Sequence, residues 1–330
     1  MLKAVFGECE RLRWGKDDKV HPKKMRWANC PGQTNAEKGT TTMSNHIRKP
    51  ESSAQGGFTL IELSIVLVII GLIVGGVLVG QDLIRAAEVR ATVAQIEKYN
   101  TAVNTFRGKY NALPGDINAA TASAFGFAAR GGNPGQGDGN GVVEGYNGTT
   151  NIGYSQGGET LFFWVDLSVG NPASSMNINL IDGSYTTYAT PATAAPAITA
   201  ATAANYFPPA KLGRGNSVYA YSTNGINYYG IAPITTTVTT GAVASTPSMT
   251  VQQAYQIDKK TDDGLPATGS VTATVGTATT ENAAQPTVNG VATGSLASTS
   301  CYDSTLNVYA LGTVTNGGNG ANCSLSFRFQ

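Results

Sequence analysis

The residue types that most often carry chemistry, histidine and cysteine, lie toward the two ends of this chain. They are His21, His46, Cys9, Cys30, Cys301 and Cys323. From residue 58 onward the sequence contains no histidine, so that part holds no His-based catalytic triad and no typical zinc site. Neither a P-loop nor a Gly-rich dinucleotide motif occurs. We therefore predict that the protein is not an enzyme.

Oxygen donors at alternate positions make one stretch a candidate calcium loop. Asp138 and Asn140 lie within the glycine-rich segment 137–141, and Glu144 follows closely. Ca²⁺ takes six to eight oxygen ligands, and alternate spacing in a loop can wrap such an ion. Val142 stands where an EF-hand would place a third ligand. A solvated turn is therefore the alternative interpretation.

A second acidic cluster lies at the end of a predicted helix. It consists of Asp258, Asp262 and Asp263, beside two lysines. Carboxylate oxygens are ligands that Ca²⁺ prefers, so a second calcium site is one interpretation. The other is a helix end followed by a turn at Gly264. We expect no other cofactor.

A single carboxylate interrupts the longest apolar stretch of the chain. Residues 58–80 read FTLIELSIVLVIIGLIVGGVLVG, and Glu62 is the only charged residue among these 23. Such a stretch can cross a hydrocarbon core of ~30 Å at ~1.5 Å per residue. A carboxylate costs at least ~2.5 kcal/mol near the centre of a membrane helix, so Glu62 is a functional candidate. A plain membrane anchor leaves that residue unexplained, and a secretory signal peptide has a shorter apolar stretch.

Residues 56–62, GGFTLIE, stand at the start of this apolar stretch. They resemble the processing site of type IV prepilins and type II secretion pseudopilins. The resemblance implies that prepilin peptidase cuts after Gly57 and that the new N-terminal residue, Phe58, is N-methylated. It also implies that Glu62 neutralises the amine of a neighbouring subunit during assembly. Pairing the two charges removes most of the cost of placing each in apolar surroundings.

The residues before the cut divide into two parts. Residues 43–57 have the length and charge of a prepilin leader, in which Arg48 and Lys49 keep the N-terminus in the cytoplasm. Residues 1–42 show no apolar periodicity. We predict that they are a mis-assigned upstream extension and that translation starts at Met43. A genuinely long leader that starts at Met1 is the alternative.

The chain after the cut predicts an α+β, pilin-like fold. Residues 58–81 form the transmembrane and assembly helix, and residues 82–111 continue it as an amphipathic half. An apolar stripe on that half recurs at spacings of three and four. It consists of Val89, Thr92, Ile96, Tyr99, Val103, Phe106 and Tyr110. We expect this long N-terminal helix to pack on a C-terminal antiparallel β-sheet domain with long loops, residues 112–330.

Within the globular domain the sequence alternates short β segments with turns. Strands are expected at 217–221, 226–231, 306–310 and 323–329, and helices at 159–167 and 250–260. Residues 186–205 and 234–247 are rich in Thr, Ala and Pro and are predicted to be long loops.

Many type IV pilins have a disulfide loop near the C-terminus, and the resemblance implies one between Cys301 and Cys323. An oxidised pair is expected if the domain folds outside the inner membrane. Closing a loop of this length stabilises by roughly 3 kcal/mol in the chain-entropy model. Two free buried thiols are the alternative. Calcium-stabilised loops also occur in pseudopilins, which supports the interpretation of the second acidic cluster as a calcium site.

The resemblance implies a structural subunit of a type IV pilus or a type II secretion pseudopilus. Its partners would be prepilin peptidase, other pilin or pseudopilin subunits, the inner-membrane assembly platform and the lipid bilayer. The protein would span the bacterial inner membrane once, with its globular domain in the periplasm, and later join a filament there or on the cell surface. A minor, tip-located pilin with an adhesive or DNA-uptake role is the alternative. From residue 58 onward the sequence contains eleven Lys/Arg and fifteen Asp/Glu. This part is therefore slightly acidic, and nucleic acid is not an expected partner.

Overall fold

The computed structural model describes the chain in nine segments. These are residues 57–131, 135–146, 151–152, 157–168, 178–186, 198–237, 243–274, 300–312 and 317–329. The predicted extension (1–42) and the predicted leader (43–57, apart from Gly57) lie outside the described residues. The chain separates into two units, Met1–Phe58 and Thr59–Gln330, and the second unit contains the fold described below.

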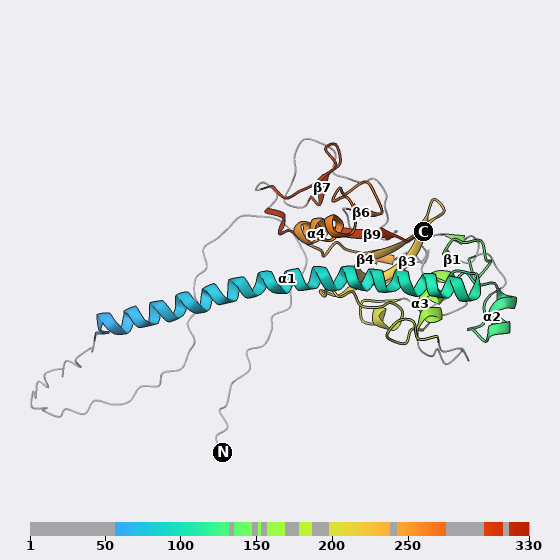
Figure 1. Cartoon of the computed structure of the whole chain (residues 1–330), viewed down its shortest axis with the longest axis horizontal. Coiled ribbons are helices and arrows are strands. Elements are labelled where there is room, and N and C mark those ends of the chain that lie inside the picture. The colour runs from blue at the N-terminus through green and yellow to red at the C-terminus, as the bar shows by residue number, and fades with distance from the viewer. Residues whose placement is uncertain are drawn as a thin grey trace, which may run out of the picture. The chain divides into compact units, whose positions relative to one another are not determined.

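One long helix, α1 (Leu60–Tyr110), dominates this unit (Figure 1). Its 51 residues include no proline, so no backbone N–H is missing from its hydrogen-bond ladder. It ends at Asn111, whose backbone is left-handed with φ of 51°, and basic side chains occupy its last turn. Such a cap satisfies a terminal carbonyl, and the positive charges favour the helix C-terminus.

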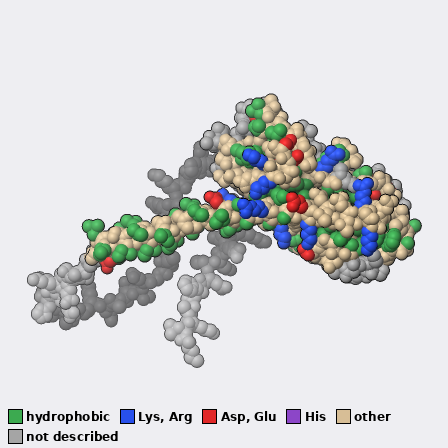
Figure 2. All heavy atoms as spheres, in the orientation of Figure 1, with side chains coloured by type: hydrophobic (Ala, Val, Ile, Leu, Met, Phe, Trp, Pro, Cys, Tyr) green, Lys and Arg blue, Asp and Glu red, His purple; other side chains and the backbone are tan. Residues whose placement is uncertain are grey.

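The first half of α1 is an exposed apolar rod. Every large apolar side chain from Leu60 to Ile84 is at least 51% exposed, and Figure 2 shows these side chains along the projecting helix. Among the described residues, this helix is the one long and apolar enough to cross a membrane. A candidate membrane-spanning helix is therefore present where the sequence predicts one, and its insertion into a membrane stays a prediction.

The second half of α1 packs on the globular domain with the predicted face. All seven residues of the predicted stripe, from Val89 to Tyr110, are buried, and Ala102 joins them. Charged side chains such as Arg90 and Glu97 are exposed on the other faces. Burying one apolar stripe of an amphipathic helix accounts for this contact.

An antiparallel sheet forms the centre of the globular domain, as the sequence predicts. Its strands in the described residues are ordered β3 (Asn216–Thr223), β4 (Ile226–Thr237), β9 (Ser324–Arg328) and β6 (Val271–Thr274). A further strand, β5 (Val243–Ser245), also pairs with β4. The C-terminal strand β9 therefore lies in the middle of the sheet, between strands that are distant in sequence.

A two-residue turn joins β3 to β4. Asn224 and Gly225 have φ of 51° and 74°, and Thr223 pairs directly with Ile226. Two successive left-handed residues match the twist of a tight β-hairpin, and Asn-Gly is the sequence that adopts them at least cost. The predicted strands 217–221 and 226–231 thus form one hairpin.

Helices and two small β-pairs surround the sheet. Helix α3 (Glu159–Leu167) is buried along its whole length, and α4 (Val251–Thr261) begins with a capping box between Thr250 and Gln253. Aromatic rings fill the space between α1, α3 and β4, where the ring centres of Tyr99 and Trp164 lie 5.1 Å apart. The smaller elements are α2 (Ala119–Phe125), the 3-10 turn η2 (Ala203–Asn205), β1 (Gly145–Tyr146), β2 (Asn151–Ile152), β7 (Tyr302–Asp303) and β8 (Val308–Tyr309).

Two expectations for the globular domain need correction. The range 234–247 is not simply a loop, because β4 continues to Thr237 and β5 pairs with it. Thr and Val favour strands when a neighbouring strand accepts them. The strand expected at 306–310 is shortened to Val308–Tyr309, because Asn307 adopts φ of 51° and ends the extended backbone.

Candidate functional site

The predicted cleavage point lies in exposed chain that is neither helix nor strand. Gly57 and Phe58 precede the helix, and the side chain of Phe58 is 87% exposed. Among the described residues, nothing lies within 4 Å of the position that a Cβ atom on Gly57 would occupy. Packing against that part of the chain therefore does not require glycine at this position. Its small size suits a tight protease cleft instead.

The first turn of α1 contains a capping box built from Thr59 and Glu62. The backbone N–H of Glu62 donates to Thr59 Oγ1 at 3.3 Å, and the backbone N–H of Thr59 donates to Glu62 Oε2 at 2.8 Å. The hydroxyl of Thr59 also donates to Oε2, again at 2.8 Å. The reciprocal bonds satisfy two backbone donors that the helix itself leaves without partners. Glu62 is thus held at the helix start by its own chain.

Four glycines follow in the exposed rod, at positions 71, 75, 76 and 80. In the part of the chain that the structure describes, no atom outside the neighbouring helix backbone lies within 4 Å of the position that a Cβ on any of these glycines would occupy. The pairs Gly71/Gly75 and Gly76/Gly80 each have the G-x-x-x-G spacing, which lets two helices approach closely in a membrane. This surface is available to another helix.

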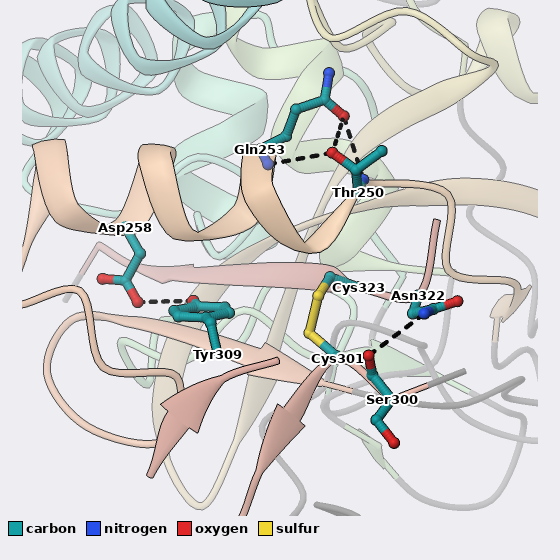
Figure 3. Close-up of a disulfide and its surroundings, with 8 residues drawn as sticks. All are labelled: Thr250, Gln253, Asp258, Ser300, Cys301, Tyr309, Asn322 and Cys323. Carbon is teal, nitrogen blue, oxygen red and sulfur yellow. Dashed lines mark hydrogen bonds between the residues drawn. A yellow bond between two sulfur atoms is a disulfide. The ribbon is translucent and has the colours of Figure 1, made fainter. Parts of the chain in front are cut away.

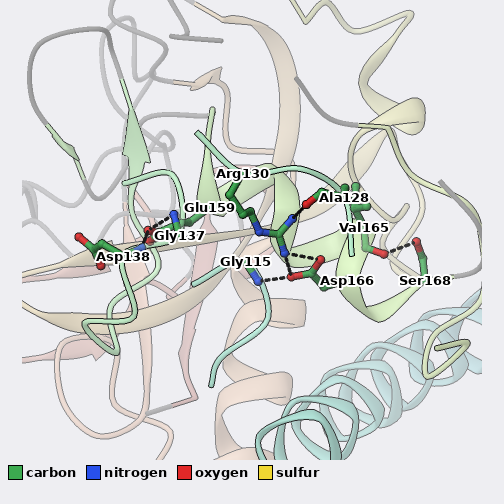
Figure 4. A network of polar contacts seen from close by, with 9 residues as sticks. All are labelled: Gly115, Ala128, Arg130, Gly137, Asp138, Glu159, Val165, Asp166 and Ser168. Atoms are coloured by element: carbon green, nitrogen blue, oxygen red, sulfur yellow. Dashed lines mark hydrogen bonds and ion pairs between the residues drawn. The ribbon is translucent and has the colours of Figure 1, made fainter. Parts of the chain in front are cut away.

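Two buried carboxylates, Asp116 and Glu159, organise the glycine-rich loop that the sequence singled out. Glu159 accepts backbone N–H bonds from Gly137 at 2.8 Å, Asp138 at 3.3 Å and Glu144 at 2.9 Å. Figure 4 shows the first two of these bonds. Asp116 accepts three more, from residues 139, 140 and 141, at 2.7–3.2 Å. The loop is thus wrapped around protein carboxylates.

The glycines make this convergence of N–H groups feasible. Gly137, Gly139 and Gly141 have φ of 100°, 78° and 87°, which is strained for residues with a side chain. Burial raises the pKa of Asp116 to about 6 and that of Glu159 well above its ordinary value, while the backbone N–H bonds lower both. Loss of solvation therefore outweighs the hydrogen bonds at both groups.

The structure brings two further carboxylates close to the predicted ligands of the first calcium loop. The carboxylate of Asp138 lies with those of Asp116 and Glu159, all ligand atoms being within 4.8 Å of one another. Asn140 turns its amide nitrogen toward Asp138 at 3.2 Å and toward Glu144 at 3.5 Å. Three carboxylates suit calcium chemically. Two of them already accept several N–H bonds, so an ion would compete with those donors.

The second acidic cluster is also engaged in holding loops. The ligand atoms of Asp258, Asp262 and Asp263 lie within 4.8 Å of one another. Tyr309 donates its hydroxyl to Asp258 Oδ2 at 2.7 Å (Figure 3), and Gly264 donates its N–H to Oδ1 at 3.2 Å. Burial raises the pKa of Asp258 to about 6. The other two accept bonds from the backbone N–H groups of Ser270, Val271 and Leu265.

A disulfide joins Cys301 to Cys323, with their Cα atoms 5.1 Å apart and both residues buried (Figure 3). Cys323 exchanges two backbone hydrogen bonds with Met249, at 3.1 and 3.2 Å. The enclosed segment contains β7 and β8, and it contacts α4 through Tyr309 and Asp258. The disulfide therefore anchors this C-terminal loop beside the central strand β9.

A buried ion pair that the sequence analysis did not find lies behind the glycine-rich loop. Arg130 and Asp166 are 2.6 Å apart with side chains 0% and 1% exposed, and Gly115 donates its N–H to Asp166 at 2.7 Å (Figure 4). The guanidinium also lies 4.1 Å from the centre of the Phe162 ring. Breaking such a pair from one side leaves a buried charge uncompensated.

Comparison with known proteins adds one match at the start of α1. The family profile named prokaryotic N-terminal methylation motif matches residues 52–78. Comparisons with curated proteins and with solved structures returned no match. The matched range contains Gly57, Phe58 and the capping box of Thr59 and Glu62. The chain thus bears the N-terminal segment that is the hallmark of type IV prepilin- and pseudopilin-like proteins.

Proposed function

We propose that this protein is a structural, non-catalytic subunit of a type IV pilus or a type II secretion pseudopilus. The observation that supports it is the position of the matched motif, whose single carboxylate lies in the first turn of an exposed apolar helix. Prepilin peptidase cuts after Gly57, and Phe58 becomes the methylated N-terminus. The globular domain lies in the periplasm before assembly, because the basic leader stays in the cytoplasm.

Assembly exchanges one apolar environment for another. In the bilayer, lipid covers residues 60–81 of the rod, and in the filament the rods of neighbouring subunits cover them. The inner-membrane assembly platform would supply the subunits for this exchange. Cleavage creates an ammonium at Phe58, and an isolated ammonium or carboxylate is costly in either environment. Pairing the ammonium of one subunit with Glu62 of the next compensates both charges and sets the axial stagger.

The test of this proposal is the exchange Glu62→Gln, which removes the charge and retains the shape. We expect processed protein to accumulate in the membrane and its incorporation into filaments to fall roughly tenfold or more, since an unpaired ammonium in apolar surroundings costs at least ~2.5 kcal/mol. Shearing of filaments followed by quantitative immunoblotting measures the incorporated fraction. Glu97→Gln, an exposed glutamate on the second half of α1, is the matched control. Unchanged incorporation of Glu62→Gln would contradict the assembly role.

One surface feature favours the second candidate, a minor tip-located pilin that acts as a binding module. A groove of about 480 Å³ lies beside α1, lined by Lys98, Tyr99, Asp182, Tyr185 and Lys211 among others. A concave site of this size is what a binding module offers to a ligand. Immunogold labelling of filaments distinguishes the two candidates, since a minor subunit labels the tips and a major subunit labels the whole shaft.

A further inference from the structure

We propose that Thr59 is a positioning residue for assembly. It holds one carboxylate oxygen of Glu62 within its own subunit, and thereby presents the other oxygen to the N-terminal ammonium of a second copy of this chain. The proposal rests on the assembly role of Glu62 given above. It adds Thr59 to the residues that act in assembly, and it assigns a different role to each carboxylate oxygen of Glu62.

The hydrogen bonds of the capping box are unequally distributed over the carboxylate. Oε2 of Glu62 accepts from both the backbone N–H and the hydroxyl of Thr59, each at 2.8 Å. Within the described residues, Oε1 takes part in no hydrogen bond. The two donors occupy Oε2 and leave Oε1 with both of its acceptor positions. One carboxylate thus has a tethered oxygen and an oxygen that remains available to a cation.

The tether matters because the surroundings are apolar. In lipid there is no water to satisfy the backbone donors of a first helical turn. Breaking the reciprocal bonds between Thr59 and Glu62 during assembly would therefore leave these donors unsatisfied, which is costly. A glutamate side chain has several rotamers, and ordering it upon pairing has an entropic cost. Holding the side chain in advance removes part of that cost, which is the usual benefit of preorganisation. The helix cap therefore also serves intersubunit pairing.

Four single variants of the full-length chain test the proposal in cells with an active filament system. Thr59→Val has the same shape as threonine and lacks the hydroxyl, whereas Thr59→Ser retains it. Ser64→Ala removes a hydroxyl of the same helix that bonds the carbonyl of Ile61 and does not contact Glu62. Glu62→Gln reports on the underlying assembly role. The readout is the incorporated fraction of processed subunit, with cleavage checked by mass spectrometry.

We expect Thr59→Val to lower incorporation about fivefold, the equilibrium change for losing one hydrogen bond of ordinary strength, here the bond from the Thr59 hydroxyl to Glu62 Oε2. Thr59→Ser and Ser64→Ala should retain wild-type incorporation. The double variant Thr59→Val/Glu62→Gln should assemble as poorly as Glu62→Gln alone, because the hydroxyl acts through the carboxylate. A purely structural cap would instead reduce the level of processed protein in the membrane and would add to the effect of Glu62→Gln.

The outcomes separate the two proposals. If Glu62→Gln impairs assembly while Thr59→Val does not, the positioning role is wrong and the assembly role stands. Additive losses in the double variant would also overturn the positioning role. If Glu62→Gln assembles normally, both proposals fail together.

Discussion

At the scale of single residues, buried carboxylates of the globular domain act as acceptors for loop backbones. Asp116, Glu159 and Asp258 are each 1% exposed or less, and each accepts N–H bonds from a loop. Burial raises the pKa of all three. Stability must then depend on pH in a defined direction, because the folded chain binds protons more tightly than the unfolded chain.

The sign follows from the pKa of Asp258, which rises from 3.8 to about 6 on folding. Its stabilising contribution is full below about pH 4 and is lost as the pH rises through about 6. Asp258→Asn should keep the bond from Gly264 and donate its amide N–H to Tyr309. We expect this variant to stay folded and to show a smaller fall in melting temperature between pH 4.5 and pH 7. Circular dichroism of the detergent-solubilised protein measures the melting temperature at each pH.

Asp258→Leu provides the matched comparison. It leaves the buried hydroxyl of Tyr309 without its acceptor, which costs about 1–3 kcal/mol of unfolding free energy. Asp82→Asn, at a side chain that is 82% exposed, should behave as wild type. An undiminished pH dependence in Asp258→Asn would assign the effect to Asp116 and Glu159 instead.

Calcium binding is a separate prediction that stays open at both acidic clusters. If an ion binds, millimolar Ca²⁺ should raise the melting temperature, because a ligand that binds the folded state alone stabilises it. Asp138→Asn and Asp263→Asn should each diminish that rise, since both remove a carboxylate ligand. Differential scanning calorimetry with Ca²⁺ or with EDTA measures the shift. Equal melting temperatures in the two buffers would contradict calcium binding at both clusters.

At the residue scale, sequence reasoning depends on contiguous signals. Glu62 could be singled out because it is a charge in an apolar run, and the matched motif contains it, while its role in assembly stays a prediction. Asp116, Glu159 and the pair Arg130–Asp166 could not, because their partners lie 15–51 residues away along the chain. From sequence alone, an acidic residue in a loop is expected to be exposed to solvent, because the tertiary contacts that bury it have no local signal. The proximity of Asp116 and Glu159 to Asp138 was missed for the same reason.

At the scale of elements, α1 shows what periodicity can establish. The stripe from Val89 to Tyr110 is predictable because a helical face repeats locally. The boundaries of β4, β5 and β8 were missed because strands depend on partners that are distant in sequence. The order of strands, with β9 between β4 and β6, likewise has no local signal.

Removing the disulfide tests the contribution of the C-terminal loop. We expect Cys301→Ser/Cys323→Ser to lower the free energy of unfolding by roughly 3 kcal/mol, since the bond closes a separation of 22 residues. Urea titration of the detergent-solubilised protein gives the value. Reductant should destabilise the wild type by a similar amount and leave the variant unchanged. Equal stability of variant and wild type would show that strand pairing alone holds the loop.

At the scale of the whole molecule, processing decides which residues belong to the working protein. We predict that protein from cells with active prepilin peptidase begins at Phe58 with a methylated amine. Intact-mass spectrometry gives the N-terminus directly. Gly57→Ile should block the cut, because a branched side chain does not fit an extended, tight cleft, whereas Gly108→Ala on the exposed face of α1 should be processed normally. Residues 43–57 still attached to the wild-type protein would contradict the prediction.

The glycines of α1 have a mechanical consequence for any filament built from it. The hydrogen bonds of a helix run along its axis, so tension on the globular end reaches the first turn through them. The helical turns between Gly71 and Gly80 would unwind first under this tension, since each glycine weakens a helix by ~1 kcal/mol relative to alanine. Extending those ten residues from ~1.5 Å to ~3.4 Å each lengthens a subunit by roughly 20 Å. Such a filament would stretch reversibly before its subunits part.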